Sequence, residues 1–132
     1  MHRNPDRPLS PHLTIWRWGP HMLVSILHRV TGAGLALVGG AALVWWLLAL
    51  AGGPEAYAGF TGWATHWTGI AVAVGLTWAL FQHGLSGLRH FVMDAGAGFE
   101  LSTNKFWATM TILGAALLTA LVWAYILFGR GA

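Results

Sequence analysis

Two histidines seven residues apart, His83 and His90, are the side chains of this sequence best suited to binding a metal. Seven residues make two turns of an α-helix, about 10.5 Å along its axis, so the two imidazoles share a face but cannot bind one iron atom together. His83 is the better candidate, because it lies roughly 8 Å inside Leu88, where a charge-free segment ends. Gly87 follows on the same face and predicts room for a porphyrin ring. We therefore expect His83 to be an axial haem ligand, with the opposite ligand supplied from elsewhere.

A structural interpretation of these residues stays open at this point. A histidine in an apolar helix is more often a hydrogen-bonded core residue than a metal ligand, and His83 could be one. Arg89, His90 and Asp94 could form a cluster that only closes the end of the helix, although Arg89 and Asp94 are five residues apart and imperfectly placed for pairing.

A second polar cluster lies at the start of another apolar run, in the sequence SILHRVTG, residues 25–32. Ser25, His28 and Arg29 have the spacing of one helix face. A charged side chain near the middle of a bilayer costs at least ~2.5–3.5 kcal/mol, so a cation kept here indicates a partner or a purpose. His28 and Arg29 could pair with haem propionates, and Ser25 and Arg29 could donate hydrogen bonds to a quinone carbonyl. Arg29 could also simply extend to lipid headgroups.

The elements that must position these clusters are transmembrane helices. Of the 132 residues, 56% are hydrophobic and only 8% are charged, whereas a soluble domain carries about 25% charged residues. Residues 30–54, 56–88 and 106–129 contain no aspartate, glutamate, lysine or arginine, and each segment exceeds the ~20 residues that cross a bilayer.

The sequence therefore predicts an all-α membrane protein with three transmembrane helices. We place them at about residues 21–50, 61–93 and 103–128, within a single membrane-anchor domain that covers residues 1–132. His21 and His66 fall near helix ends and are interpreted as interfacial residues, as are most of the nine tryptophans.

The distribution of basic residues predicts the orientation in the membrane. Lysine and arginine flank the N-terminal side of the first helix and the second connection, whereas the first connection, AGGPEAYAGFTG, has none; these residues are Arg3, Arg7, Arg17, Arg89 and Lys105. The N-terminus and the second connection are thus expected in the cytoplasm, with residues 1–20 as an irregular, proline-rich segment there. We expect a multi-pass protein of a bacterial inner membrane. This topology accounts for the net charge of +3, so no nucleic acid is expected as a partner.

Several chemistries are excluded by composition. The chain has no cysteine, so it holds no disulfide and no cysteine-ligated iron–sulfur cluster, and it lacks a flavin-binding fingerprint. Three functions remain: a haem- or quinone-binding subunit, a plain anchor for soluble subunits, and a small transporter. With one charged residue in the span region, a permeation path is the least favoured of these.

Three motifs in this order, RPLSPHLTIW, SILHRVTG and HGLSGLRHFVMD, resemble the cytochrome b subunit of succinate dehydrogenase, the larger of its two membrane anchors. The resemblance spans most of the chain. Tryptophan ends LTIW where tyrosine is common, and the third motif departs only by apolar exchanges.

The resemblance implies a complex of four different subunits that passes electrons from succinate to ubiquinone. Flavin and iron–sulfur clusters belong to the flavoprotein and iron–sulfur subunits, which this chain anchors to the membrane lipid together with a second, smaller anchor. It also implies that His83 is the haem b ligand, opposite a histidine of the smaller anchor. His28 and Arg29 then lie near the propionates, and Ser25 and Arg29 belong to the quinone site. The chain alone would not oxidise succinate, and the physiological direction stays open, since a fumarate reductase anchor would look the same.

Overall fold

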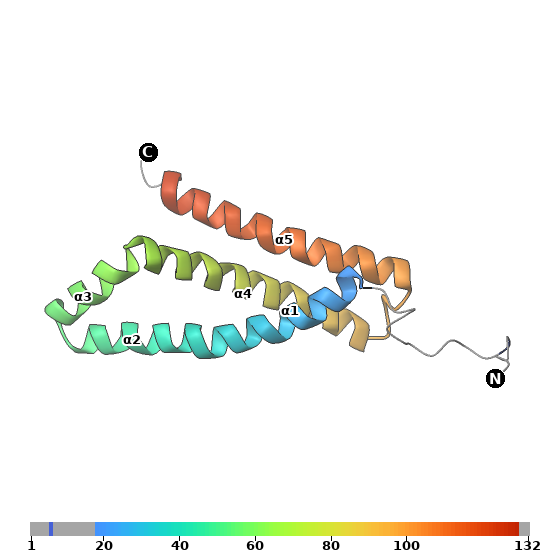
Figure 1. Cartoon of the computed structure of the whole chain (residues 1–132), viewed down its shortest axis with the longest axis horizontal. Helices are drawn as coiled ribbons and strands as arrows, with labels where there is room; N and C mark the ends of the chain where they lie inside the picture. The colour runs from blue at the N-terminus through green and yellow to red at the C-terminus, as the bar shows by residue number, and fades with distance from the viewer. Residues whose placement is uncertain (1–5, 7–17, 130–132) are drawn as a thin grey trace, which may run out of the picture.

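The computed structural model describes Asp6 and residues 18–129, and every regular element in this part of the chain is a helix (Figure 1). Predictions for Arg3, Arg7 and Arg17 lie outside the described residues. In chain order the elements are α1 (Pro20–Gly34), η1 (Leu35–Gly39), α2 (Gly40–Ala51), α3 (Pro54–Ala64), α4 (Trp67–Asp94) and α5 (Leu101–Phe128).

Three helical stretches are long and apolar enough to cross a membrane. The first, Pro20–Ala51, is the continuous run of α1, η1 and α2, and the other two are α4 and α5. The all-α, three-span fold class expected from the sequence is thus confirmed. The start of α1, the end of α4 and the start of α5 gather at one end of the bundle (Figure 1), which brings the SILHRVTG and HGLSGLRH motifs to the same end.

The first span contains a π-helical turn, η1. The backbone N–H of Gly40 bonds to the carbonyl oxygen of Leu35, five residues earlier, where a regular α-helix would bond four residues earlier. The residues around it are small or aliphatic, and a methyl group at Gly39 would meet Leu76 of α4 at 3.6 Å. The first span is therefore two α-helices joined by a wider turn.

The second span begins at Trp67 rather than at about residue 61, because the first connection contains a helix of its own. Gly53, with φ of 91°, reverses the chain, and Pro54 then favours the first turn of α3. The backbone of His66 is extended, and its side chain accepts a hydrogen bond from the N–H of Thr68. His66, interpreted from the sequence as an interfacial residue, thus caps the start of α4.

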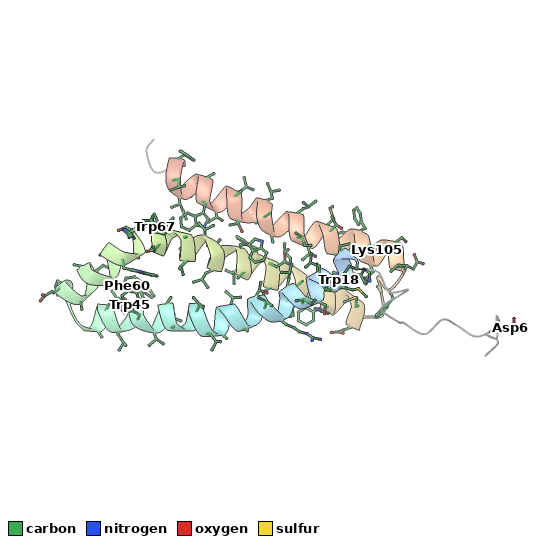
Figure 2. All side chains as sticks on the ribbon, viewed as in Figure 1. Asp6, Trp18, Trp45, Phe60, Trp67 and Lys105 are labelled. Carbon is green, nitrogen blue, oxygen red and sulfur yellow. The ribbon has the colours of Figure 1, made fainter. Side chains whose placement is uncertain are left out.

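Helix α3 folds back against α2 through aromatic contacts. The ring of Trp45 lies 5.1 Å from that of Phe60 and 5.0 Å from that of Trp63, measured between centroids (Figure 2). The α3–α4 corner is then closed by Gly69, which is buried against the end of α3. This end of the bundle is thus closed by aromatic packing and by a tight α3–α4 corner.

The interior of the bundle is built from small side chains. Helix α4 packs against both α1 and α5, and the buried residues are mostly alanine, threonine, serine and glycine, which let helix backbones approach closely. Large apolar side chains face outward instead; Leu37 is 73% exposed and Phe128 is 80% exposed. This arrangement suits a lipid environment, where outward apolar side chains carry no cost.

Buried polar groups in this interior are satisfied in different ways. The hydroxyl groups of Thr111 and Thr119 donate to carbonyl oxygens of their own helix, at 2.9 and 2.7 Å. Gln82 is completely buried, and neither atom of its amide has a hydrogen-bond partner. An unpaired buried amide costs about 1–3 kcal/mol, so the side chain of Gln82 lowers the free energy of unfolding of this bundle.

Replacing Gly69 with alanine tests the tight α3–α4 corner. A methyl group there would lie 2.8 Å from Cα of Ala64 and would also overlap the carbonyl oxygen of Trp63. Because backbone atoms cannot move aside as a flexible side chain can, we expect Gly69→Ala to lower the free energy of unfolding by roughly 1–3 kcal/mol. The shift in thermal midpoint, followed by circular dichroism in detergent, measures it. Gly62→Ala is the control, since nothing lies within 4 Å of its added methyl; equal midpoints would contradict the assignment.

Candidate functional site

The two sequence motifs meet through His28 of α1 and His83 of α4. Their imidazole rings are stacked, with centroids 4.0 Å apart and planes inclined by 9°. The two residues are 55 positions apart in the chain, and the structure brings their side chains into direct contact. Both side chains are half-buried, and the two residues lie within α1 and within the C-terminal half of α4.

The hydrogen bond made by His83 fixes which of its ring nitrogens is free. Its Nδ1 lies 3.0 Å from the backbone carbonyl oxygen of His28. Because a carbonyl oxygen only accepts, Nδ1 carries the proton, and in the neutral ring Nε2 keeps its lone pair. Thr31 lies nearby, with Oγ1 3.4 Å from the same Nδ1, while its own hydroxyl donates to the carbonyl oxygen of Leu27 at 2.6 Å. An Nδ1–H bonded to a carbonyl is the usual support for an imidazole that binds metal through Nε2.

The Nε2 atom of His83 is accessible. No hydrogen bond to it is found among the described residues, and the buried unpartnered side-chain nitrogens there belong to His21 and Gln82 instead. His83 therefore presents a lone pair at the surface of this chain.

His28 is held from its other side by α4. Its Nδ1 lies 2.6 Å from Oγ of Ser86, whose hydroxyl is also positioned to donate to the carbonyl oxygen of His83 at 3.1 Å. The ring of His90 meets the His28 ring edge-on, with centroids 5.1 Å apart. Three histidines thus form one cluster in which His28 is central, and Nε2 of His28 remains available for an additional hydrogen bond.

Glycines allow α1 to approach His83 this closely. A methyl group at Gly32 would lie 2.8 Å from Cε1 of His83, so any larger residue would displace the ring. Gly87, predicted from the sequence to leave room beside His83, instead faces His28, because its added methyl would be 3.8 Å from Cε1 of His28. An added methyl at Gly84 would meet nothing within 4 Å, so the open surface beside His83 continues at Gly84.

Ser25 and Arg29 lie on α1 next to this cluster but are not tied into it. Arg29 is exposed and Ser25 is half-buried. Among the described residues, neither side chain makes a hydrogen bond with the histidines. Both side chains are thus free to contact a molecule outside the chain.

Arg89 does not belong to the histidine cluster. Its Nη2 donates a 2.7 Å hydrogen bond to Oδ1 of Asn104, at the start of α5. The Asn104 amide donates in turn to the Gly98 carbonyl oxygen and to Sδ of Met93, at 3.2 and 3.4 Å. The alternative in which Arg89 pairs with Asp94 and His90 to close α4 is therefore not what this end of the helix contains.

Thr31, Ser86 and Asn104 were not identified from the sequence. Ser86 follows His83 by three residues and so shares its face of α4, a signal that was available. Asn104 lies on α5 and bonds to Arg89 and Met93 of α4, and no local sequence pattern predicts these contacts. In the part of the chain that the structure describes, no group of three or more histidine and carboxylate side chains could hold a bare metal ion.

Comparison with known proteins places this arrangement in a family. The model of the succinate dehydrogenase/fumarate reductase transmembrane subunit matches residues 3–122. The chain belongs to this family. It is 39% identical over 117 residues to the succinate dehydrogenase cytochrome b556 subunit of Paracoccus denitrificans, with 88% of each chain covered.

Relatives from other organisms give similar matches. The cytochrome b556 subunit of Rickettsia conorii is 35% identical over 89% of this chain and 90% of its own. The succinate dehydrogenase cytochrome b560 subunit of Reclinomonas americana is 34% identical over 97% of this chain and 90% of its own. The resemblance drawn from the three motifs is confirmed, and the chain is a membrane anchor subunit of the succinate dehydrogenase type.

The contact between α1 and His83 can be tested in this anchor subunit with two neighbouring glycines. Gly32→Ala forces the His83 ring away from α1, so we expect the thermal midpoint of the purified protein to fall, by an amount that corresponds to roughly 1–3 kcal/mol of overpacking. Gly34→Ala, in the same helix, adds a methyl with nothing within 4 Å and should leave the midpoint unchanged. Differential scanning fluorimetry in detergent measures both, and a Gly32→Ala protein as stable as the wild type would contradict this packing.

Proposed function

We propose that the chain is the haem b-binding membrane subunit of a succinate:ubiquinone oxidoreductase. The observation that carries the proposal is the hydrogen bond from Nδ1 of His83 to the His28 carbonyl oxygen, which leaves Nε2 as an accessible ligand atom. Relatives in this family are named cytochrome b subunits, which supports haem as the group that His83 binds.

The donor set fits a haem held between two subunits. His83 would supply one nitrogen ligand to the haem iron, and a histidine of the smaller anchor subunit would supply the other. Arg29 is exposed, so its guanidinium suits the carboxylates of the two propionates. His28 can donate to a propionate from Nε2 in the tautomer in which its Nδ1 accepts the hydrogen bond of the Ser86 hydroxyl. When bound, the haem provides a one-electron redox centre within the membrane. The contributions of this chain are the fixed ring of His83 and the positive charge that neutralises the propionates.

The quinone site lies at the same end of the bundle. Reduction of ubiquinone consumes two electrons and two protons, and the electrons come from the iron–sulfur subunit of the complex. Ser25 and Arg29 are one helical turn apart on α1, so the hydroxyl and the guanidinium can donate hydrogen bonds to one quinone carbonyl oxygen. Donors fixed in this way stabilise the negative charge that develops on that oxygen during reduction.

The orientation follows from the same residues. Arg29 lies on α1, Arg89 in the last two turns of α4 and Lys105 in the second turn of α5, while the connection between α2 and α4 has no lysine or arginine. We infer that the end with these basic residues faces the cytoplasm of a bacterium, with the flavoprotein and iron–sulfur subunits docked against it. This placement puts the quinone site next to its source of electrons.

Substitution of the two histidines of α4 tests the ligand assignment. His83→Ala removes the axial nitrogen and should abolish or strongly weaken the haem b band, seen in a reduced-minus-oxidised visible spectrum of the purified complex. His90→Ala removes only an edge contact with His28 and should leave most of the band. Equal losses in both variants would mean that His83 is not the specific ligand.

The role of Arg29 can be separated from assembly by two electron acceptors. Arg29→Ala removes a donor to the quinone, so we expect the rate with ubiquinone to fall by about 10²-fold or more, the effect of losing one donor to a developing oxyanion. Succinate oxidation by an artificial dye that accepts electrons upstream should be nearly unchanged. Arg29→Lys keeps the charge and should restore part of the ubiquinone rate. A parallel loss of both activities would instead indicate failed assembly of the complex.

A further inference from the structure

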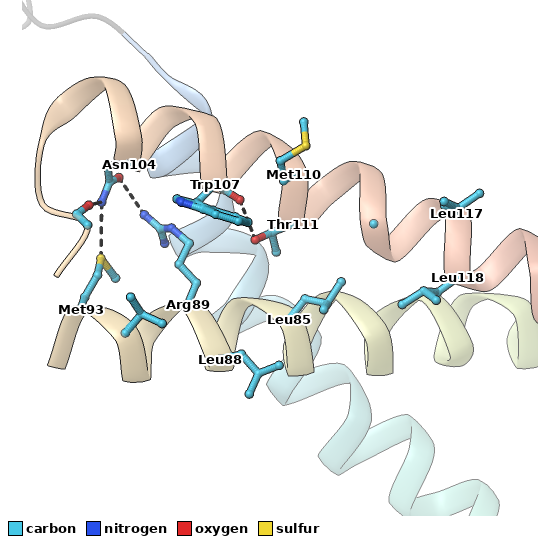
Figure 3. Close-up of a pocket in the computed structure, with 13 residues that line it drawn as sticks. Leu85, Leu88, Arg89, Met93, Asn104, Trp107, Met110, Thr111, Leu117 and Leu118 are labelled. Carbon is cyan, nitrogen blue, oxygen red and sulfur yellow. Dashed lines mark hydrogen bonds between the residues drawn. The ribbon is translucent and has the colours of Figure 1, made fainter. Parts of the chain in front are cut away.

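A groove of about 560 Å³ runs between α4 and α5 (Figure 3). Arg89 and Asn104 lie at the end of the groove near the α4–α5 connection, and the rest of its lining is apolar apart from Thr111. The Thr111 hydroxyl already donates to the carbonyl oxygen of Trp107 at 2.9 Å. The groove is therefore an apolar channel with one cationic end.

This groove faces away from the histidine cluster. Successive residues of an α-helix are about 100° apart around its axis, so Leu85 and Val92 lie on the side of α4 opposite His83. Both line the groove. Its occupant is thus distinct from the haem and the quinone, and the inference does not depend on the function proposed for the histidines.

Within residues 18–129, the cationic end of the groove has no compensating charge. The guanidinium of Arg89 is half-buried, and the side chain that it contacts is the neutral amide of Asn104. Among the described residues, no carboxylate lies within ion-pair distance of Arg89. Asn104 is itself fixed by its bonds to Gly98 and Met93, so the guanidinium is held at the mouth of the groove with several of its five N–H donors unused. Guanidinium groups bind phosphate oxygens strongly and often through two parallel hydrogen bonds.

The length of the groove matches one leaflet of a bilayer. From Asn104 to Leu118 the axis of α5 rises about 21 Å, compared with roughly 15 Å for half of a ~30 Å hydrocarbon core. The excess brings Asn104 and Arg89 to the depth of the headgroups. Gly114 leaves space inside the groove, since a methyl group added there would point at Leu85 across the groove, 3.2 Å from its Cδ1.

We propose that the α4–α5 groove binds an anionic phospholipid, with its phosphate on Arg89 and an acyl chain along the two helices. A cation at the mouth and an apolar body of leaflet depth match both parts of such a molecule. A transmembrane helix of another subunit would fill the apolar part but would leave the Arg89 charge buried without a counterion. A free phosphate ion would make no use of the apolar part.

The experiment uses the purified complex, stripped of lipid in detergent and then titrated with phosphatidylglycerol or phosphatidylcholine in mixed micelles. Bound lipid is counted by native mass spectrometry, and the thermal midpoint is followed in parallel. The wild type should bind phosphatidylglycerol at least tenfold more tightly than phosphatidylcholine and should gain stability from it. No preference for the anionic lipid would overturn the proposal.

Two variants remove the cationic end in different ways. Arg89→Gln deletes the charge, and Asn104→Asp keeps a hydrogen-bond acceptor for Arg89 while neutralising it with a carboxylate. Each should lower the affinity for phosphatidylglycerol at least tenfold with little effect on phosphatidylcholine. Lys105→Gln is the matched control, since Lys105 is a cation on the same end of α5 that does not line the groove; it should change the affinity less than twofold. Equal effects at Lys105 and Arg89 would show that only general surface charge matters, against the proposal.

The apolar part and the rival occupants are tested separately. Met110→Trp narrows the groove and should weaken binding of both lipids. Competition by inorganic phosphate at millimolar concentration, with no dependence on the acyl chain, would assign the site to a free anion and overturn the proposal. A photo-crosslinking residue at Leu117, which is 59% exposed and lines the groove, should label lipid; labelling of another subunit would assign the groove to a protein and also overturn it.

Discussion

The hydrogen bond between His83 and the backbone carbonyl of His28 is the interaction on which the histidine-bearing end of the bundle depends. It joins α1 to α4, sets the tautomer of the ring and decides which nitrogen faces outward. This hydrogen bond requires a glycine at position 32. In an α-helix the N–H of the residue four positions on shares the same carbonyl, so the ring that reaches the His28 carbonyl must lie over position 32, and only glycine leaves it room. One contact therefore fixes a histidine, a glycine and a helix–helix distance together.

The parts of this site that the sequence could predict are those set by a single helix. Spacing within α1 and within α4 puts His28, Arg29 and His83 on definite faces, and the lengths of the charge-free segments put them at one depth. What spacing cannot supply is the partner across the helix pair. The choice of a backbone carbonyl for His83 and of Ser86 for His28 depends on how residues more than fifty positions apart meet.

The same limit explains the first connection. Pro54 and the residues around His66 are ordinary signals for a helix start, but the segment 56–88 without Asp, Glu, Lys or Arg covers most of α3 and of α4, so hydropathy alone does not mark the boundary between them. Structure at this end is set by Gly53, by the His66 cap and by the packing of Trp45 on α3. Hydropathy shows whether a segment is apolar enough to contact lipid. It does not show that α3 is a separate helix, outside the second span, which begins at Trp67.

Because of the π-helical turn at residues 35–39, the side chains of α2 are rotated about the helix axis relative to those of α1. One additional residue in a turn rotates everything beyond it by about 100° relative to an uninterrupted α-helix. The face of α1 that carries Ser25 and Arg29 therefore does not continue along α2, and Trp45 is turned toward α3 instead. A single membrane span thus presents two differently oriented packing faces, one that carries the histidine contact with α4 and one that packs against α3.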